Sequence, residues 1–155
     1  MSTATHGIAE VSYVSRPQLP ADLANAWRRA PSQPLGPLAA AEEVPVDMAR
    51  LLEMVDDDAA ALRELVNLYL SESAELMGSL RSAVQAGSAE QVEWAAHKLG
   101  GSSATCGMIG IVAPLRELER SGRAGHSSQN EPLLLEAGRQ HRRICAYLEA
   151  HVLHH

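Results

Sequence analysis

The chain has 155 residues and a net charge of -6 at neutral pH, from 19 acidic and 13 basic side chains. This length suits one domain with one core, and the acidic balance argues against a partner rich in phosphate such as DNA or RNA. Phenylalanine is absent, and two Trp and three Tyr are the aromatic residues. The composition therefore disfavours a β-sandwich or barrel and favours helices built on Ala and Leu.

Cysteine content and hydropathy bear on the compartment. The chain has two cysteines and begins without an apolar leader, a combination typical of a reducing, cytoplasmic setting. No apolar run approaches the roughly 18 residues that a helix needs to cross a bilayer. We therefore expect a cytoplasmic protein with no membrane partner.

The chain divides near residue 43. Six of the eight prolines lie in the first 45 residues, among Ser, Ala, Gln and Gly and without apolar periodicity. Such a composition predicts a disordered or weakly ordered N-terminal arm over residues 1–43, in which residues 22–29 are the one candidate for a short helix. The acidic excess lies in the remainder, and we expect the folded domain to cover residues 44–153.

The sequence after residue 43 predicts several helices, with capping residues at their ends. Asp47 is placed to cap a short helix that buries Leu51 and Leu52, and a run of three aspartates precedes the next helix. That second helix is long, because apolar residues recur at spacings of three and four as far as Gly87, a residue suited to a left-handed cap. Ser88 then begins the third helix with the pattern of a capping box.

Two further helices complete the pattern. The fourth follows Gly107 and is expected to end at Gly122, and Pro114 must either kink this helix or mark its first turn. A polar loop leads to Asn130, where the last helix begins. Four main amphipathic helices joined by short turns predict an all-α fold, an antiparallel four-helix bundle preceded by a short helix.

The third helix carries the candidate chemistry. On a helical wheel, its apolar residues lie about 140° to 200° from His97, so the imidazole is expected to point away from the core. Gly100 and Gly101 follow one turn later, and each glycine costs about 0.5 to 1 kcal/mol relative to Ala inside a helix. We interpret this loss as the mark of a functional surface that lets a large partner approach the imidazole.

At this point the sequence resembles a known family. Residues 97–107, HKLGGSSATCG, are similar to the signature H-x-L-K-G-S-S-x-x-x-G of histidine-containing phosphotransfer (HPt) domains. The resemblance extends over about residues 44–150, and includes the long second helix, the joint at residues 87–88 and the segment 115–119. It implies that the predicted bundle is of HPt type.

The resemblance also implies a function. His97 would be the phosphorylated residue of a two-component phosphorelay, accepting a phosphoryl group from the aspartate of one receiver domain and passing it to another. The partners would be the receiver domains of response regulators and hybrid histidine kinases. The resemblance implies a phosphocarrier without a cofactor of its own, since Mg²⁺ would be bound by the receiver. The sequence has no Gly-rich nucleotide loop, so we expect no autokinase activity.

One departure from the family pattern concerns charge. The family's usual basic residue three positions after the histidine, which can screen the phosphoryl group, is Gly100 here. Lys98 is the nearest cation in sequence, about 100° around the helix from His97. Arg123 corresponds to a basic position that some members place near the phosphorylated site. Lys98 and Arg123 are therefore both candidates for phosphoryl screening.

The remaining motif residues divide into docking and structural groups. The residues expected to contact a receiver are Trp94, Gly100, Gly101 and Ala104, although a tryptophan at a helix edge is more often a half-buried anchor. Ser102 and Ser103 are assigned mainly to close helix packing. Gly107 is assigned to the turn that follows.

Alternative interpretations stay open. A helical adaptor could dock receivers or kinases without carrying phosphate, and the chain could also be part of a larger sensor or chemotaxis-like kinase. Histidines 151, 154 and 155 cluster near the C-terminus, but no Cys, Asp or Glu completes a ligand set, so no metal site is predicted. We expect a monomer, as suits a shuttling carrier.

Overall fold

The computed structural model describes residues 43–154. Five α-helices follow one another, and the last continues into one π-helical segment. The predicted N-terminal arm, apart from its last residue, and the candidate helix over residues 22–29 lie outside the described residues. The helix bounds are α4 (Met48–Met54), α5 (Ala59–Ala86), α6 (Ala89–Thr105), α7 (Ile109–Ala124), α8 (Asn130–Leu148) and the π-helix η2 (Glu149–Leu153).

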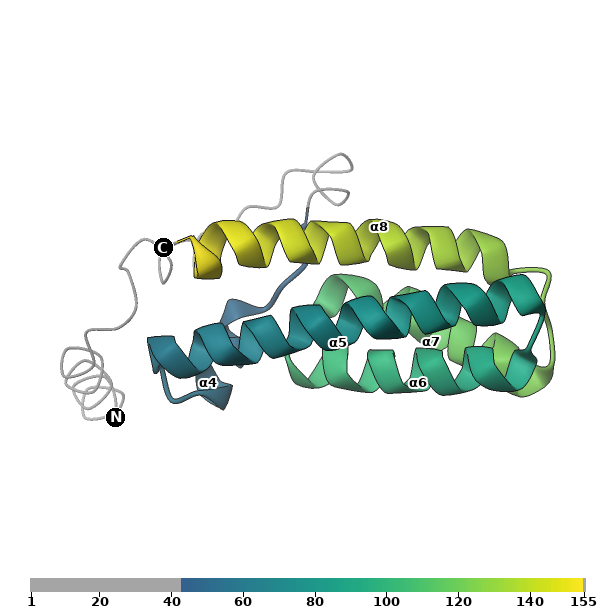
Figure 1. The fold of residues 1–155 in the computed structure, drawn as a ribbon, viewed down its shortest axis with the longest axis horizontal. Coiled ribbons are helices and arrows are strands. Elements are labelled where there is room, and N and C mark those ends of the chain that lie inside the picture. Colours follow the sequence, from purple (N-terminus) through teal and green to yellow (C-terminus); the bar gives the residue numbers. More distant parts are fainter. Residues whose placement is uncertain (1–42, 155) are drawn as a thin grey trace, which may run out of the picture.

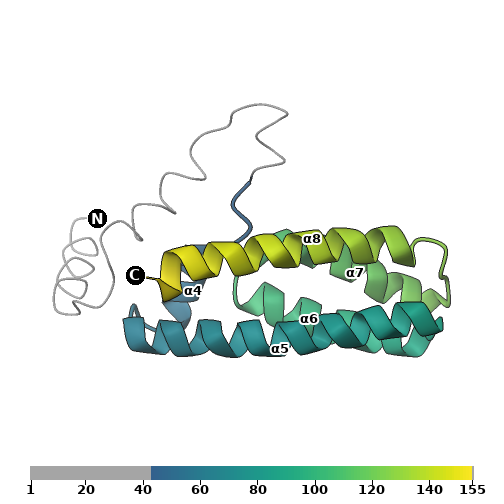
Figure 2. The same cartoon turned by 45° about the horizontal axis from the view of Figure 1, so that its top comes forward.

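The helices α5, α6, α7 and α8 form an antiparallel bundle (Figure 1). Each packs against its neighbour in sequence, and α5 also packs against α8, which closes the ring. The short helix α4 lies near the end of the bundle where α5 begins, as the rotated view confirms (Figure 2). The predicted fold, an all-α four-helix bundle with a short preceding helix, is therefore confirmed for residues 43–154. None of these helices is long and apolar enough to cross a membrane.

The predicted caps define the helix ends. The Asp47 carboxylate accepts a hydrogen bond from the backbone N–H of Arg50, and the Ser88 hydroxyl accepts one from Gln91. Gly87 ends α5 in the left-handed conformation, with φ of 67°, which a residue without a Cβ adopts at little cost. These contacts satisfy backbone groups that a helix end otherwise leaves unpaired.

The apolar stripes of the four long helices meet in one core. Leu99 of α6, Leu115 and Leu118 of α7 and Ile144 of α8 are fully buried. Along each long helix the buried residues recur mainly at spacings of three and four, which places them on a single face. Packing of this core therefore fixes which side of α6 faces the interior and which side faces outward.

Residues 45–47, a short segment just before α4, are hydrogen-bonded to the turn between α6 and α7. The backbone N–H of Asp47 donates to the carbonyl of Gly107, and the N–H of Gly110 donates to the carbonyl of Pro45. Gly107 has φ of 77°, and a Cβ there would lie 2.8 Å from the Asp47 carbonyl oxygen. Gly107 is thus required by the turn and by the close approach of this segment, in line with its predicted structural role.

The predicted end of α7 at Gly122 is wrong. The helix continues to Ala124 and ends at Gly125, whose φ of 71° is left-handed. Gly122 instead lies at the α6 interface, where a Cβ would come within 2.6 Å of the Glu93 backbone nitrogen and 2.7 Å of the Ala89 carbonyl oxygen. Its missing side chain therefore serves close helix packing. Pro114 does not mark the first turn either, because α7 begins at Ile109.

We predict that Gly122→Ala destabilises the bundle. The atoms that the new methyl group would meet belong to the α6 backbone and cannot rotate away, so α6 and α7 must separate. The expected loss in the free energy of unfolding is about 1–3 kcal/mol, measured by urea denaturation.

Gly78→Ala is the matched control for this prediction. It also adds one methyl group inside a helix, but nothing lies within 4 Å of the position. This control should raise the stability by about 0.5–1 kcal/mol. A Gly122→Ala variant as stable as the wild type would contradict the packing argument.

Candidate functional site

His97 lies near the middle of α6 and points away from the core. Ala95, Ala96 and Leu99 of the same helix are fully buried, whereas 72% of the His97 side chain is exposed. The orientation follows from the helical repeat, because the buried stripe occupies the opposite side. The exposed imidazole expected from the sequence is confirmed, and one edge of its ring is open to an approaching partner.

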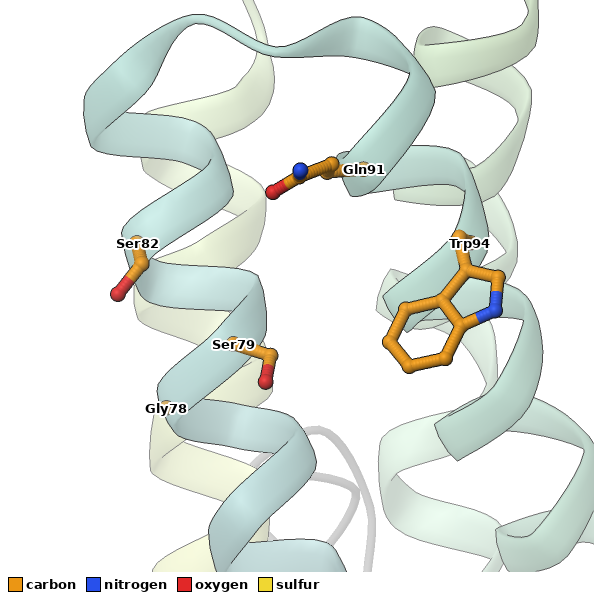
Figure 3. A pocket seen from close by; sticks show the side chains of 5 residues that line it. All are labelled: Gly78, Ser79, Ser82, Gln91 and Trp94. Carbon is orange, nitrogen blue, oxygen red and sulfur yellow. The ribbon is translucent and has the colours of Figure 1, made fainter.

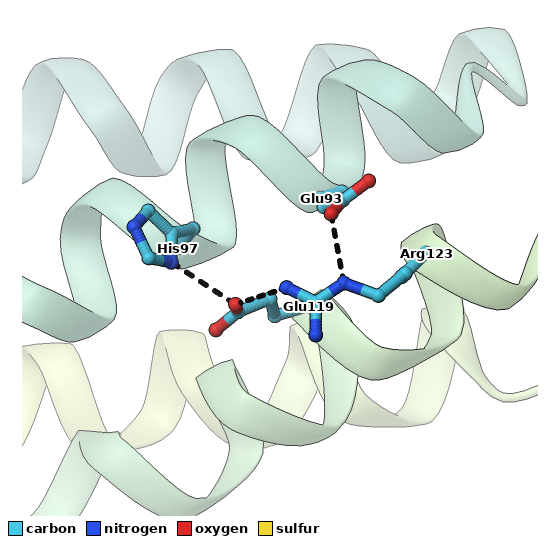
Figure 4. Close-up of polar contacts among 4 residues, drawn as sticks. All are labelled: Glu93, His97, Glu119 and Arg123. Atoms are coloured by element: carbon cyan, nitrogen blue, oxygen red, sulfur yellow. Dashed lines mark hydrogen bonds and ion pairs between the residues drawn. The ribbon is translucent and has the colours of Figure 1, made fainter.

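The other edge of the ring is bound by α7. His97 Nδ1 lies 3.0 Å from Glu119 Oε1, and this same oxygen accepts a 2.8 Å hydrogen bond from an Arg123 terminal nitrogen. Arg123 Nε donates in turn to Glu93 Oε1 at 3.0 Å, back on α6. Figure 4 shows these four side chains in a row across the α6–α7 interface. The imidazole is thus held by a partner from the neighbouring helix.

The charges in this row reinforce one another. The pKa of Glu119 is lowered, first by the hydrogen bond from His97 and then by Arg123. The pKa of Arg123 is raised by its hydrogen bonds to Glu93 and Glu119. At neutral pH, Glu119 is therefore a carboxylate and Arg123 a cation, and the row remains fully charged where it touches the imidazole.

The two screening candidates take different positions. The Lys98 ammonium lies over the Trp94 ring, 5.3 Å from its centroid, in a cation–π contact on the side of α6 away from Glu119. Arg123 is linked to His97 through Glu119. The structure therefore brings Arg123 into the row of side chains around His97, and directs Lys98 toward Trp94.

The two glycines after His97 face different ways. Gly100 is buried, and a Cβ there would contact Leu115 Cβ of α7 at 3.6 Å. Its prediction as a docking residue is therefore wrong, because it belongs to the helix interface. Gly101 is exposed with nothing within 4 Å of a Cβ position, and Ala104 is half-buried. These two leave a low surface on the C-terminal side of the imidazole.

Trp94 lies one turn before His97 and is 55% exposed. About half of the residue is therefore accessible to a partner, and its role as a docking contact stays a prediction. Its ring borders an open groove of about 640 Å³ between α5 and α6. Figure 3 shows the groove with its lining residues, Gly78, Ser79, Ser82, Gln91 and Trp94. Small polar side chains on the α5 side leave the indole accessible.

Two residues of the site escaped the sequence analysis. They are Glu93, and Glu119, which was noted only within the segment 115–119. Glu119 and Arg123 are four residues apart on α7, a spacing typical of a helical ion pair. That pairing was available from the sequence, whereas the contact with His97 depends on the register between two helices.

Comparison with known proteins identifies the family of this chain. The Hpt domain family model matches residues 64–152, more than half of the chain. The chain belongs to the Hpt family. A solved structure, histidine-containing phosphotransfer protein B (HptB) from Pseudomonas aeruginosa PAO1, shares the fold with a TM-score of 0.67 and 22% sequence identity. The match covers 72% of this chain and 96% of that one. No curated protein matches the sequence.

Membership in the Hpt family assigns a general role. Hpt domains are phosphocarriers that take part in phosphorelay signalling and interact with receiver domains. The family match begins within α5 and ends in η2, so it includes the four long helices, although not all of α5. Within residues 43–154, no group of His, Cys, Asp and Glu side chains is arranged to hold a metal ion.

The serines of the Hpt signature take part in packing. Ser103 is buried, and its hydroxyl shares a 2.9 Å hydrogen bond with the hydroxyl of Tyr69 on α5. Burial raises the pKa of Tyr69 well above its ordinary range, so this hydroxyl stays protonated. Ser102 donates to the carbonyl of Leu99 within its own helix. Both serines therefore have structural contacts and neither touches His97.

We predict that Ser103→Ala lowers the free energy of unfolding by about 1–3 kcal/mol, because the buried Tyr69 hydroxyl loses its partner. The double variant Tyr69→Phe/Ser103→Ala should recover part of this loss, since no hydroxyl is then left unpaired. Chemical denaturation of the three proteins measures the effect. A double variant less stable than Ser103→Ala would argue against the hydrogen bond as the cause.

Proposed function

We propose that His97 is the phosphoryl carrier of this Hpt domain, and that it relays the group between aspartates of two receiver domains. The observation that supports this choice is a histidine 72% exposed on a helix face, with the low surface of Gly101 beside it. Among the other histidines, His126 lies in the loop before α8, and His141 is half-buried and bonded to Ser73. His97 combines exposure with a fixed position in the bundle.

The transfer requires only the imidazole from this chain. A neutral ring nitrogen attacks the phosphorus of the receiver's aspartyl phosphate, the phosphorus–oxygen bond breaks, and the aspartate leaves as a carboxylate. The reverse step delivers the group to an acceptor aspartate. In this proposal the receiver supplies Mg²⁺ and the positive groups that stabilise the transferring phosphoryl group, so docking completes the reaction site.

The surface beside His97 suits such a visitor. On one side, Trp94 presents an exposed ring at the edge of the α5–α6 groove, and exposed tryptophans are common in protein interfaces. On the C-terminal side, Gly101 and Ala104 leave the main chain accessible. A receiver can therefore place its aspartyl phosphate against the imidazole without moving a helix.

We predict that incubation with a phosphorylated receiver transfers phosphate to the domain, and that His97→Gln abolishes the labelling. The label should be acid-labile and base-stable, as expected of phosphohistidine, and is followed with radioactive phosphate on gels. Stable binding to the receiver without any label would instead support the adaptor function.

We also predict that Gly101→Trp slows transfer from a receiver by more than about tenfold, because an indole would fill the space that the partner needs next to His97. Phosphorylation by phosphoramidate, a small chemical donor, should be nearly unchanged. The comparison of the two donors separates blocked docking from a damaged imidazole. Equal transfer from the receiver to both proteins would contradict the assigned docking face.

A further inference from the structure

Within the described residues, α7 carries three exposed arginines in different surroundings. Arg120 forms an ion pair with Glu117, and Arg123 is bonded to two carboxylates. Arg116, in contrast, makes no ion pair and no side-chain hydrogen bond with any residue that the structure describes. Its guanidinium is therefore available to an anion from outside the chain.

The position of Arg116 is related to that of Arg123 by seven residues. Seven residues make about two turns, so both side chains leave α7 on nearly the same side, the side from which Arg123 reaches Glu93 of α6. Because α6 and α7 are antiparallel, the α6 residue opposite Arg116 is Gly100, seven residues after Glu93. The 3.6 Å distance between a Cβ at Gly100 and the Cβ of Leu115 agrees with this register.

The second carboxylate partner of Arg123 lies on α7 itself. It is Glu119, one turn earlier in the helix. The residue at the same spacing before Arg116 is Val112. The two carboxylates that bind Arg123 therefore have no counterparts around Arg116, which faces Gly100 and a valine instead.

This unpaired arginine is close to the imidazole. Arg116 is three residues from Glu119, the α7 residue that contacts His97, which is about 4.5 Å along the helix axis. It lies on the side of Glu119 toward Gly101, where nothing occupies the 4 Å around a Cβ position. A long side chain from α7 therefore has room to reach a group carried on the ring.

A phosphoryl group on His97 would need such a cation. The group adds about two negative charges, and the row beside the ring already holds two carboxylates and one guanidinium. Lys98 is directed toward Trp94. When a receiver leaves, its positive groups leave with it, so the phosphorylated domain retains an excess of negative charge around the ring.

We propose that Arg116 binds the phosphoryl group on His97 and screens its charge while the domain carries the group between receivers. This inference rests on the proposed function of His97. It gives to Arg116 the screening role that the sequence analysis assigned to Lys98 or Arg123. Arginine suits this role because its planar guanidinium donates two parallel hydrogen bonds to a phosphoryl group.

The first test measures the lifetime of phosphohistidine, formed with phosphoramidate and followed by phosphorus-31 NMR at neutral pH and low ionic strength. Arg116→Ala should shorten the lifetime roughly threefold to tenfold, because uncompensated negative charge around the ring favours loss of the phosphoryl group. Arg116→Lys should keep most of the wild-type lifetime, since it keeps the charge. A lifetime in Arg116→Ala equal to that of the wild type would overturn the proposal.

Arg120→Ala is the matched control. Arg120 is exposed on the same helix, about one turn after Arg116, but its charge is paired with Glu117. The control removes the same charge from α7, and its phosphohistidine should last as long as that of the wild type. Equal shortening in the two alanine variants would mean that the net charge of α7 sets the lifetime, and would contradict a contact with Arg116.

The second test detects the contact itself by nitrogen-15 NMR of the arginine side chains. After phosphoramidate treatment, the Nε–H of Arg116 should exchange with water more slowly, because a hydrogen-bonded group is protected from exchange. The Nε–H of Arg120 should be unchanged, and His97→Gln should abolish the effect. An Arg116 signal that does not respond to phosphorylation, or that responds equally in His97→Gln, would refute the proposed contact.

These outcomes are distinct from a failure of the proposed function, because both tests use a chemical donor and no receiver. Protection of Arg116 in a protein that no receiver labels would remove the relay function and leave the phosphoryl contact in place. Normal transfer from a receiver to His97, with no response at Arg116, would overturn this inference and leave the relay function in place. Failure of both donors to phosphorylate His97 would overturn the two together.

Discussion

The close packing of α6 against α7 is the contact on which the site depends. Gly122 of α7 lets the two backbones approach, because a Cβ there would collide with main-chain atoms of α6. On α6, Gly100 faces the Leu115 side chain of α7. This approach brings Glu119 within hydrogen-bond distance of His97. The imidazole is thus exposed on the outer face of α6 and contacted by a side chain of α7.

The site also shows how an exposed residue can be well placed without being buried. The His97 side chain is 72% exposed, so it lacks the packing that usually fixes a side chain. In place of packing, one hydrogen bond to Glu119 holds the ring. Glu119 is itself held by Arg123, which is also bonded to Glu93. Ion pairs at a surface contribute little to stability on their own, so their value here lies in geometry.

Much of the fold was accessible from sequence, because helix caps and apolar spacing are local properties. Asp47, Gly87 and Ser88 mark helix ends where the structure has them, and the wheel gave the outward direction of His97. The errors arose where glycine has more than one physical role. Gly122 resembled a helix end and Gly100 a docking surface, whereas both serve the interface between helices, which depends on register and has no local signature.

The hydrogen bonds between residues 45–47 and the α6–α7 turn set where the chain enters the bundle from its N-terminal side. Arg50 donates to the carbonyl of Thr105, eight residues after His97 and so about 12 Å along the helix axis. Residues 45–47 therefore lie near the same end of α6 as Gly101. A module tethered there would meet His97 at an effective concentration set by linker length, and a weak intrinsic affinity would suffice.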